Sequence, residues 1–277
     1  MQLAQRGSQS SNATRVDWET ALDKCVPIGR TLFAASLFCL GIEHFIYGEF
    51  VTGRAPAWPA AVPGQTLWAW IGGTIVVVTS AAMLAGKAAR TAAIVLAVLI
   101  FTWALLRHIP VVAAADLLAG EWTRMVKALA FTGGALAVAA VSPEVASSRH
   151  SRWLEFVNQN DRFILIGKLC LAAFMINNGL QHFIFTDFVA SLIPRWFPGN
   201  GVFWAYCSAW LLFAGALGMF HPRTARPAAL LTGIMVFSWV WIVHVTQLHV
   251  SKSANLAVFE AAAIAGIAFL VAGYRAR

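Results

Sequence analysis

Four histidines fall in or at the ends of long apolar runs, where ionisable side chains are rare: His44, His108, His182 and His244. Ionisable residues in such runs usually face the interior of a helix bundle or a wet cavity. An imidazole there can bind a metal ion or haem iron, relay protons, or form a hydrogen bond with a quinone carbonyl. A histidine near a helix end can also simply bond a backbone carbonyl, and this structural interpretation stays open.

Polar and aromatic residues stand at helical spacing from these histidines. Asn178 is four residues before His182, so both side chains share a helix face. Trp103 and Trp239 each precede a histidine by five residues and could wall a cavity beneath it. The histidines are also the candidate metal ligands. The predicted cofactor-binding residues are His44, His108, His182, His244, Trp103, Trp239, Asn178, Gln181 and Glu43.

Lys127 and Glu260 are ionisable residues inside apolar runs, and a charge there is costly unless it is paired or hydrated. The two residues occupy equivalent positions in an internal alignment of the chain. They could pair with each other, or each could pair within its own half, for example Glu260 with a histidine of the second half. We predict that they form a structural ion pair, without a catalytic role.

The elements that must position these side chains are membrane-spanning helices. The chain has 277 residues, of which 59% are apolar and 12% charged, about half the charged share of a soluble protein. Apolar runs of about 20 residues, enough for a helix to cross a bilayer, recur along the chain, and backbone groups in hydrocarbon must be paired internally. The sequence predicts eight helical spans, at residues 28–48, 66–86, 90–112, 122–141, 163–186, 202–220, 227–249 and 254–274.

The formal net charge of +8 does not indicate nucleic-acid binding, because the basic residues sit at alternate helix ends rather than on one patch. The lipid bilayer, with its acidic head groups, is the expected partner. Most basic residues fall in the termini and in the second, fourth and sixth connections, which share one side of the membrane. The positive-inside rule places that side in the cytoplasm. We expect a multi-pass protein of a bacterial-type cytoplasmic (inner) membrane with both termini cytoplasmic.

The chain also contains an internal duplication. Residues 28–51 align without gaps on residues 166–189, and FTWALLRH (101–108) returns as FSWVWIVH (237–244). Because each unit has an even number of spans, the copies insert in the same direction. We predict an all-α membrane protein of two tandem, parallel-oriented four-helix bundles with pseudo-two-fold symmetry. The predicted divisions are a cytoplasmic N-terminal tail (1–27), a first repeat (28–141), a cytoplasmic linker (142–161) and a second repeat (162–277).

Three motifs follow in the same order in each repeat: a first helix ending in G-x-x-H-F, a P-x-W loop, and a last helix with K/E-x-x-A-x-x-G. This order resembles the DoxX family of small four-helix membrane proteins, so the chain looks like two fused DoxX-type units. The resemblance implies a link to quinone-coupled sulfur oxidation or other redox systems, and therefore quinone and other membrane or extracytoplasmic redox proteins as partners. It implies no catalytic residues.

Three functions are compatible with these features. The first is a redox-associated protein, such as a membrane subunit of a quinone-linked oxidoreductase. It would bind a quinone, or as a second choice a metal ion or haem, where all four histidines meet at one depth near the outer surface. The second is a scaffold or assembly subunit of a membrane complex, and the third a transporter of a small solute or lipid. No P-loop, Rossmann fingerprint, GxSxG, HExxH or CxxCH motif occurs.

Overall fold

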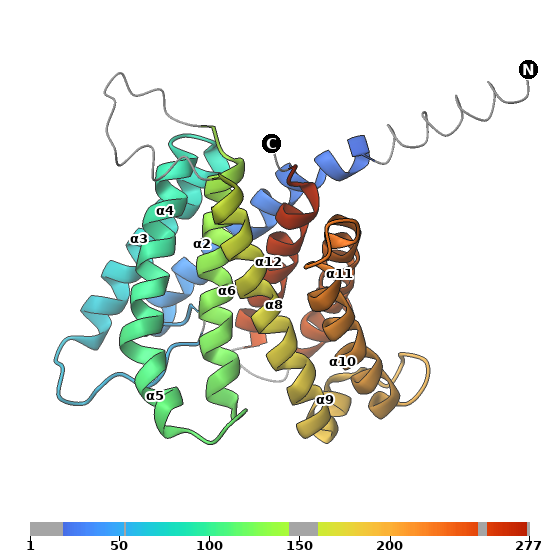
Figure 1. Ribbon diagram of the computed structural model, residues 1–277. Coiled ribbons are helices and arrows are strands. Elements are labelled where there is room, and N and C mark those ends of the chain that lie inside the picture. Colours follow the sequence, from blue (N-terminus) through green and yellow to red (C-terminus); the bar gives the residue numbers. More distant parts are fainter. Residues whose placement is uncertain (1–18, 53, 144–159, 249–253, 276–277) are drawn as a thin grey trace, which may run out of the picture.

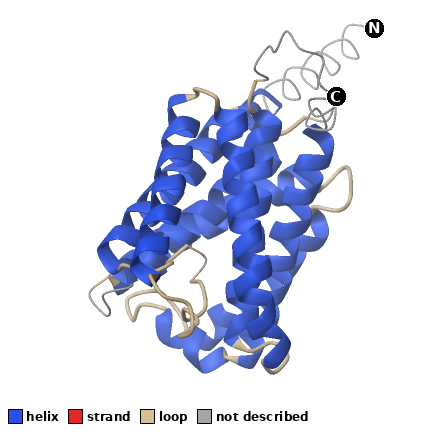
Figure 2. Ribbon diagram, turned by 90° about the vertical axis from the view of Figure 1, so that its left-hand side faces the viewer, coloured by secondary structure: helices blue, strands red, loops and turns tan. Residues whose placement is uncertain are grey.

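The computed structural model describes residues 19–52, 54–143, 160–248 and 254–275. Within these ranges all regular secondary structure is helical (Figure 2). Eight of the helices are long and apolar enough to cross a membrane, one for each predicted span. The predicted number of spans is therefore confirmed, and the helices fit an integral membrane protein. Most of the predicted tail and linker lies outside the described residues, as does His249, for which the sequence favours a structural role at a helix end.

The helices follow the predicted spans closely and add short segments at one end of the molecule (Figure 1). The first span reaches back to Glu19, so the end of the predicted tail is helical. The elements are α2 (Cys25–Tyr47), α3 (Gln65–Ala85), α4 (Ala89–Trp103), η1 (Ala104–His108), α5 (Ile109–Ala114), α6 (Gly120–Val141), α8 (Asn160–Ile184), α9 (Thr186–Leu192), α10 (Gly201–Gly218), α11 (Ala225–Trp239), η2 (Val240–His244), η3 (Val245–Gln247) and α12 (Ala254–Gly273).

The two helices that end each half of the chain, α6 and α12, form the centre of the molecule. They are the most buried of the spanning helices and contact each other. In the first half α2, α3, α4 and α6 pack in chain order, and in the second half α8, α10, α11 and α12 do the same. The halves meet where α6 packs along α8 and α12 packs along α2 (Figure 1). Each half thus packs its last helix against the first helix of the other half.

Glycines allow both of these contacts between the halves. A Cβ on Gly29 of α2 would lie 2.6 Å from the carbonyl oxygen of Gly266 in α12, and a Cβ on Gly167 of α8 would lie 2.8 Å from that of Gly133 in α6. Lipid tails are as apolar as the helix surfaces, so helices in a membrane associate mainly through close packing, which small residues permit. The two interfaces therefore depend on backbone-to-backbone contact at glycine.

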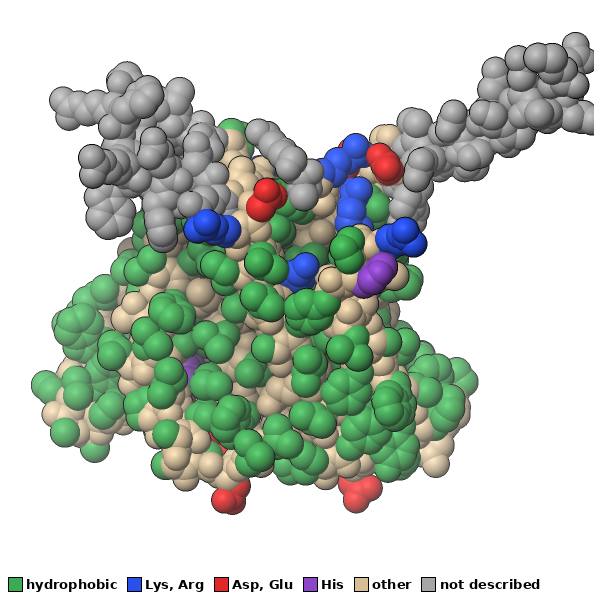
Figure 3. Space-filling model, viewed as in Figure 1, with side chains coloured by type: hydrophobic (Ala, Val, Ile, Leu, Met, Phe, Trp, Pro, Cys, Tyr) green, Lys and Arg blue, Asp and Glu red, His purple; other side chains and the backbone are tan. Residues whose placement is uncertain are grey.

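Two arginines bind the carboxyl-terminal ends of the central helices. Arg90 of α4 donates a hydrogen bond to the carbonyl oxygen of Ala139 in α6 (2.9 Å), and Arg226 of α11 donates one to that of Ala272 in α12 (2.9 Å). The last carbonyls of a helix lack intrahelical partners, so these bonds satisfy them. On the face shown in Figure 3, Lys and Arg gather at the end of the molecule near the chain termini, and the flank is hydrophobic.

Candidate ligand-binding site

Two short π-helical turns position the histidines of the third span in each half. The N–H of Ile109 bonds the carbonyl of Ala104, and the N–H of Val245 bonds that of Val240. The turns end at His108 and His244 respectively. A π turn brings residues five apart closer to one face than an α-helix does, and such turns are frequent at functional sites. Apolar periodicity does not predict these turns, although the repeated five-residue spacing from tryptophan to histidine is a signal in the sequence.

In the first half, aromatic rings and an arginine fill the space beside His44. The ring of Phe50 stacks on Trp58 with centroids 5.4 Å apart, and contacts Trp103 at 5.1 Å. The guanidinium of Arg107 lies over Phe50 at 4.9 Å and over Trp58 at 5.1 Å, and it donates to a backbone carbonyl in the loop that carries Trp58. His44 is fully buried behind these rings. The first half therefore has a closed cluster of side chains at this position.

The aligned position in the second half is open. Val243 stands where the first half has Arg107, so the second half lacks an arginine at this position. Phe188 and Trp196, which align with Phe50 and Trp58, are each 65% exposed. Trp239 stays close to His182, with ring centroids 6.3 Å apart. No arginine fills this position, and the exposed Phe188 ring lines the space beside His182 without closing it.

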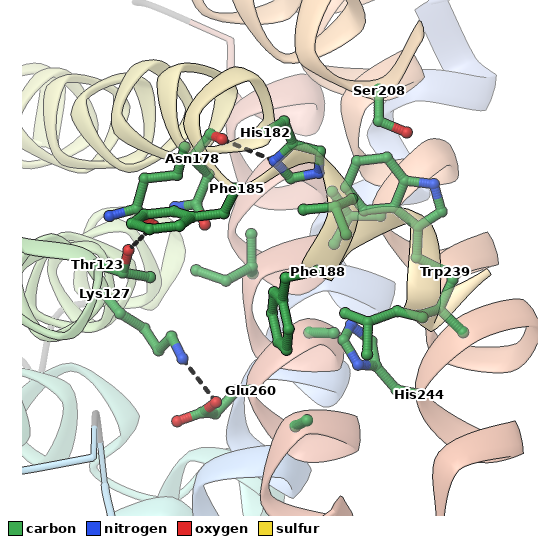
Figure 4. A pocket seen from close by; sticks show the side chains of 18 of the residues that line it. Thr123, Lys127, Asn178, His182, Phe185, Phe188, Ser208, Trp239, His244 and Glu260 are labelled. Carbon is green, nitrogen blue, oxygen red and sulfur yellow. Dashed lines mark hydrogen bonds and ion pairs between the residues drawn. The ribbon is translucent and has the colours of Figure 1, made fainter. Parts of the chain in front are cut away.

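This space belongs to a cavity of about 790 Å³ that both halves of the chain line. The first half contributes one loop residue and the start of α6, and the second half contributes α8 to α12 (Figure 4). The polar and charged lining residues are Arg54, Thr123, Arg124, Lys127, Asn178, Gln181, His182, Ser208, His244, Gln247 and Glu260. The large apolar ones are Phe174, Phe185, Phe188, Val189, Leu192, Ile193, Leu212, Val236, Trp239, Val243 and Ile264.

A charged cluster forms one side of the cavity. Lys127 Nζ lies 2.7 Å from Glu260 Oε2, and Arg54 Nε lies 3.1 Å from the same oxygen. The Lys127 and Glu260 side chains are 12% and 5% exposed, so this contact between α6 and α12 is largely shielded from water. The other oxygen of Glu260 has no hydrogen-bond partner among the described residues. Arg54 is a third member that the sequence analysis had not connected with the pair.

The hydrogen bond of His182 determines what its ring can do in the cavity. Nδ1 lies 2.7 Å from the carbonyl oxygen of Asn178, which can only accept, so Nδ1 carries a proton. In the neutral ring Nε2 is then an acceptor. In Figure 4 the His182 ring lies near Trp239, and His244 lies across the cavity beyond Phe188. A ligand hydroxyl could donate to His182 Nε2 while its ring packs beside Trp239.

Two other predicted site residues hold helix ends. Gln181 Nε2 donates to the carbonyls of Leu118 and Ala119 (3.1 Å each), just before α6. Glu43, which aligns with Gln181, accepts a hydrogen bond from Asn255 in the first turn of α12. Gln181 also lines the cavity. Glu43 does not, and its described hydrogen bond joins α2 to α12.

The structure brings together only part of the predicted site. The cavity is lined by His182, His244, Trp239, Asn178 and Gln181, together with Lys127 and Glu260. The residues outside it are His44, His108, Trp103 and Glu43. In the described part of the chain no group of three or more His, Cys, Asp or Glu side chains could hold a metal ion. The four histidines proposed as metal ligands therefore do not form such a group.

Eight apolar helices of bilayer length fit an integral membrane protein, and the described residues of both halves line a cavity between them. A family model described as "Domain of unknown function (DUF8561)" matches residues 171–272. The matched region runs from α8 to α12 and contains most of the cavity lining, including His182, Trp239, His244 and Glu260. Comparison with curated proteins and with solved structures finds no match.

Proposed function

We propose that this protein is a redox-associated membrane protein that binds a quinone or quinol in the cavity of its second half. The observation that carries the proposal is a difference between aligned positions. The Phe50 and Trp58 rings fill the space beside His44, whereas the aligned Phe188 and Trp196 rings leave a cavity open beside His182. A flat ring in that cavity would occupy the space that an aromatic side chain takes in the first half.

The polar groups of the cavity suit the oxygens of such a ring. A neutral His182 accepts a hydrogen bond at Nε2, which fits the hydroxyl of a quinol, and its protonated form would donate to a quinone carbonyl. Gln247 and His244 add further polar groups on the same lining. The large apolar residues, including Phe188, Leu192 and Trp239, suit the ring and the start of an isoprenoid tail.

We also propose that the chain consists of two duplicated four-helix units that resemble the DoxX family. The glycine contacts of α2 with α12 and of α6 with α8 repeat in the two halves, as do the π turns that end at His108 and His244. These repeats favour two parallel units about a pseudo-two-fold axis. The cationic end would then face the cytoplasm, and the cavity would lie in the outer leaflet of a bacterial inner membrane, open to extracytoplasmic redox partners.

Quinone binding can be measured directly. Protein purified from membranes should release a quinone on solvent extraction. A short-chain benzoquinone or naphthoquinone should also quench tryptophan fluorescence with saturation at one molecule per chain. His182→Leu removes the acceptor nitrogen and should weaken binding at least about tenfold. His221→Leu, the same change at an exposed histidine outside the cavity, should leave binding unchanged. Absence of saturable quenching in the unaltered protein would refute the proposal.

The scaffold function remains the second candidate, because several polar side chains of the predicted layer serve packing. Gln181 and Glu43 hold the starts of α6 and α12, and such bonds would be needed without any ligand. A scaffold predicts that His182→Leu changes the activity of the host complex only in proportion to the amount of protein in the membrane. A larger loss of activity at equal abundance favours the ligand site.

A further inference from the structure

The charged side of the cavity carries an excess of positive charge. Arg54, Arg124 and Lys127 line the cavity, and Glu260 is the one carboxylate among the described lining residues. Lys127 and Arg54 share a single oxygen of Glu260, and Arg124 has no ion pair within the described ranges. The cavity wall is therefore cationic even after the ion pairs are counted.

This concentration of cations is unusual for that end of the molecule. Lys and Arg gather mainly at the opposite end, near the chain termini (Figure 3). The other described Lys and Arg residues near this end of the molecule are Arg107 in η1, which stacks on aromatic rings, and Arg195 in the connection after α9. An anion that enters a cavity partly shielded from water interacts strongly with the cations of its lining, and ionisable residues inside membrane spans, such as Lys127, usually mark functional sites.

The start of α6 adds to the same electrostatic field. Gly120, its first residue, lines the cavity, and a Cβ at this position would meet no atom within 4 Å. The first N–H groups of a helix lack intrahelical partners, and the helix dipole places a partial positive charge there. Thr123 and Lys127 follow on the cavity side of the helix (Figure 4), and Arg124 also lines the cavity. The first turn also carries Glu121, which is not among the lining residues of the cavity. The side of the helix start that faces the cavity therefore presents cationic side chains, a favourable environment for an anion.

We propose that this side of the cavity, formed by Arg54, Arg124, Lys127 and the start of α6, binds a carboxylate-type anionic group. The adjoining apolar lining, which includes Phe174 and Phe185, would hold the body of an amphiphile that carries this group. A small free anion would use the same cationic side without the apolar lining. The proposal shares the cavity with the proposed quinone site but does not depend on a quinone being bound.

Three probes that differ either in charge or in chain length test the anion subsite. The full-length protein in phosphatidylcholine nanodiscs is titrated with dodecanoate, with its methyl ester and with acetate, and binding is measured by calorimetry. We expect the ester to bind at least about tenfold more weakly than dodecanoate, because it cannot accept charge-assisted hydrogen bonds from the cations. Tighter binding of dodecanoate than of acetate identifies an amphiphile, and equal binding identifies a small anion. Equal affinity for the acid and its ester overturns the proposal.

A pair of surface arginines provides matched variants. Arg124 is exposed and forms no described ion pair, so Arg124→Gln should not disturb folding, yet it should weaken dodecanoate binding by about three- to tenfold. Arg195→Gln makes the same change outside the cavity lining and should leave affinity unchanged. An unchanged affinity in Arg124→Gln, or equal losses in both variants, overturns the subsite. If the protein binds dodecanoate but no quinone, only the proposed function is refuted. If it binds a quinone but not dodecanoate, only the anion subsite is refuted.

Discussion

Replacing Glu260 by glutamine removes the only described anion that pairs with Lys127, and this substitution should be the most damaging single change in the charged cluster. The Lys127 side chain is 12% exposed and its nitrogen lies 2.7 Å from Glu260. Leaving one partner of a buried pair uncompensated typically costs 3–5 kcal/mol. Because Lys127 retains slight access to water, we expect Glu260→Gln to lower the free energy of unfolding by about 3 kcal/mol.

Removing Lys127 should lower the free energy of unfolding less than removing Glu260 does, because the cluster has two cations and one anion. In Lys127→Met the Glu260 carboxylate keeps Arg54, whose Nε lies 3.1 Å from it, so we expect a loss of about 1 kcal/mol. The double variant contains neither buried charge and should also lie within about 1 kcal/mol of the unaltered protein. Arg54→Gln removes a side chain that is 38% exposed and should cost less than about 1 kcal/mol.

The measurement is reversible unfolding of the purified protein in mixed micelles, followed by tryptophan fluorescence, for both single variants and the double variant. The structure predicts strong coupling, with the double variant more stable than Glu260→Gln alone. Two results would refute this reasoning. One is a larger loss for Lys127→Met than for Glu260→Gln, and the other is a double variant whose loss equals the sum of the single losses.

Three further predictions concern packing. Arg107→Val removes the cation that stacks on Phe50 and Trp58, so these rings should move and open a second cavity beside His44. Native mass spectrometry of the quinone-loaded variant should then find two ligands per chain instead of one. Gly29→Ala should lower the free energy of unfolding by about 2 kcal/mol, because the new Cβ would lie 2.6 Å from a backbone oxygen. As a control, Gly120→Ala should change the free energy of unfolding by less than about 1 kcal/mol, because its Cβ would meet no atom within 4 Å. Arg90→Met should lower the thermal midpoint, since it removes a bond to a carbonyl at the end of α6, whereas the exposed Arg195→Met should not.

The spanning helices could be predicted because their cause is local. A run of apolar residues of bilayer length must pair its own backbone, so composition alone indicates a helix. The structure places a helix at every predicted span, and differs mainly at the ends. The short helix α9 was not predicted, because it follows the fifth span within a connection, where apolar periodicity gives little information. Helix α5 is instead the end of the third span, which continues through the π turn to Ala114.

The π turns could not be predicted from the pattern of apolar residues. A π turn and an α turn have the same composition, and the difference is one hydrogen bond between Ile109 and Ala104, or between Val245 and Val240. Packing against neighbouring helices decides which bond forms. The spacing of five residues from Trp239 to His244 was visible in the chain, but an α-helix would have turned the two side chains apart.

The charged cluster of Lys127, Glu260 and Arg54 was likewise predicted only in part from the sequence. The sequence left open whether Lys127 pairs with Glu260 or within its own half, and the structure joins the two because α6 contacts α12. Arg54 reaches Glu260 from a tight turn, where its N–H bonds the carbonyl of Val51 and its φ is 53°. No spacing rule connects a loop residue with a carboxylate 206 positions later in the chain.

The amino-acid sequence by itself determined the number of spans, their helical nature and the repeated chemistry of the two halves, because these depend on residue type and on spacing within short segments. Only the tertiary structure decided that His182 and His244 line a cavity whereas His44 is buried behind aromatic rings. A cavity is the volume that side chains from distant segments fail to fill. Its presence therefore depends on the placement of Phe188 and on the absence of a stacking arginine at Val243, once all the helices have packed together.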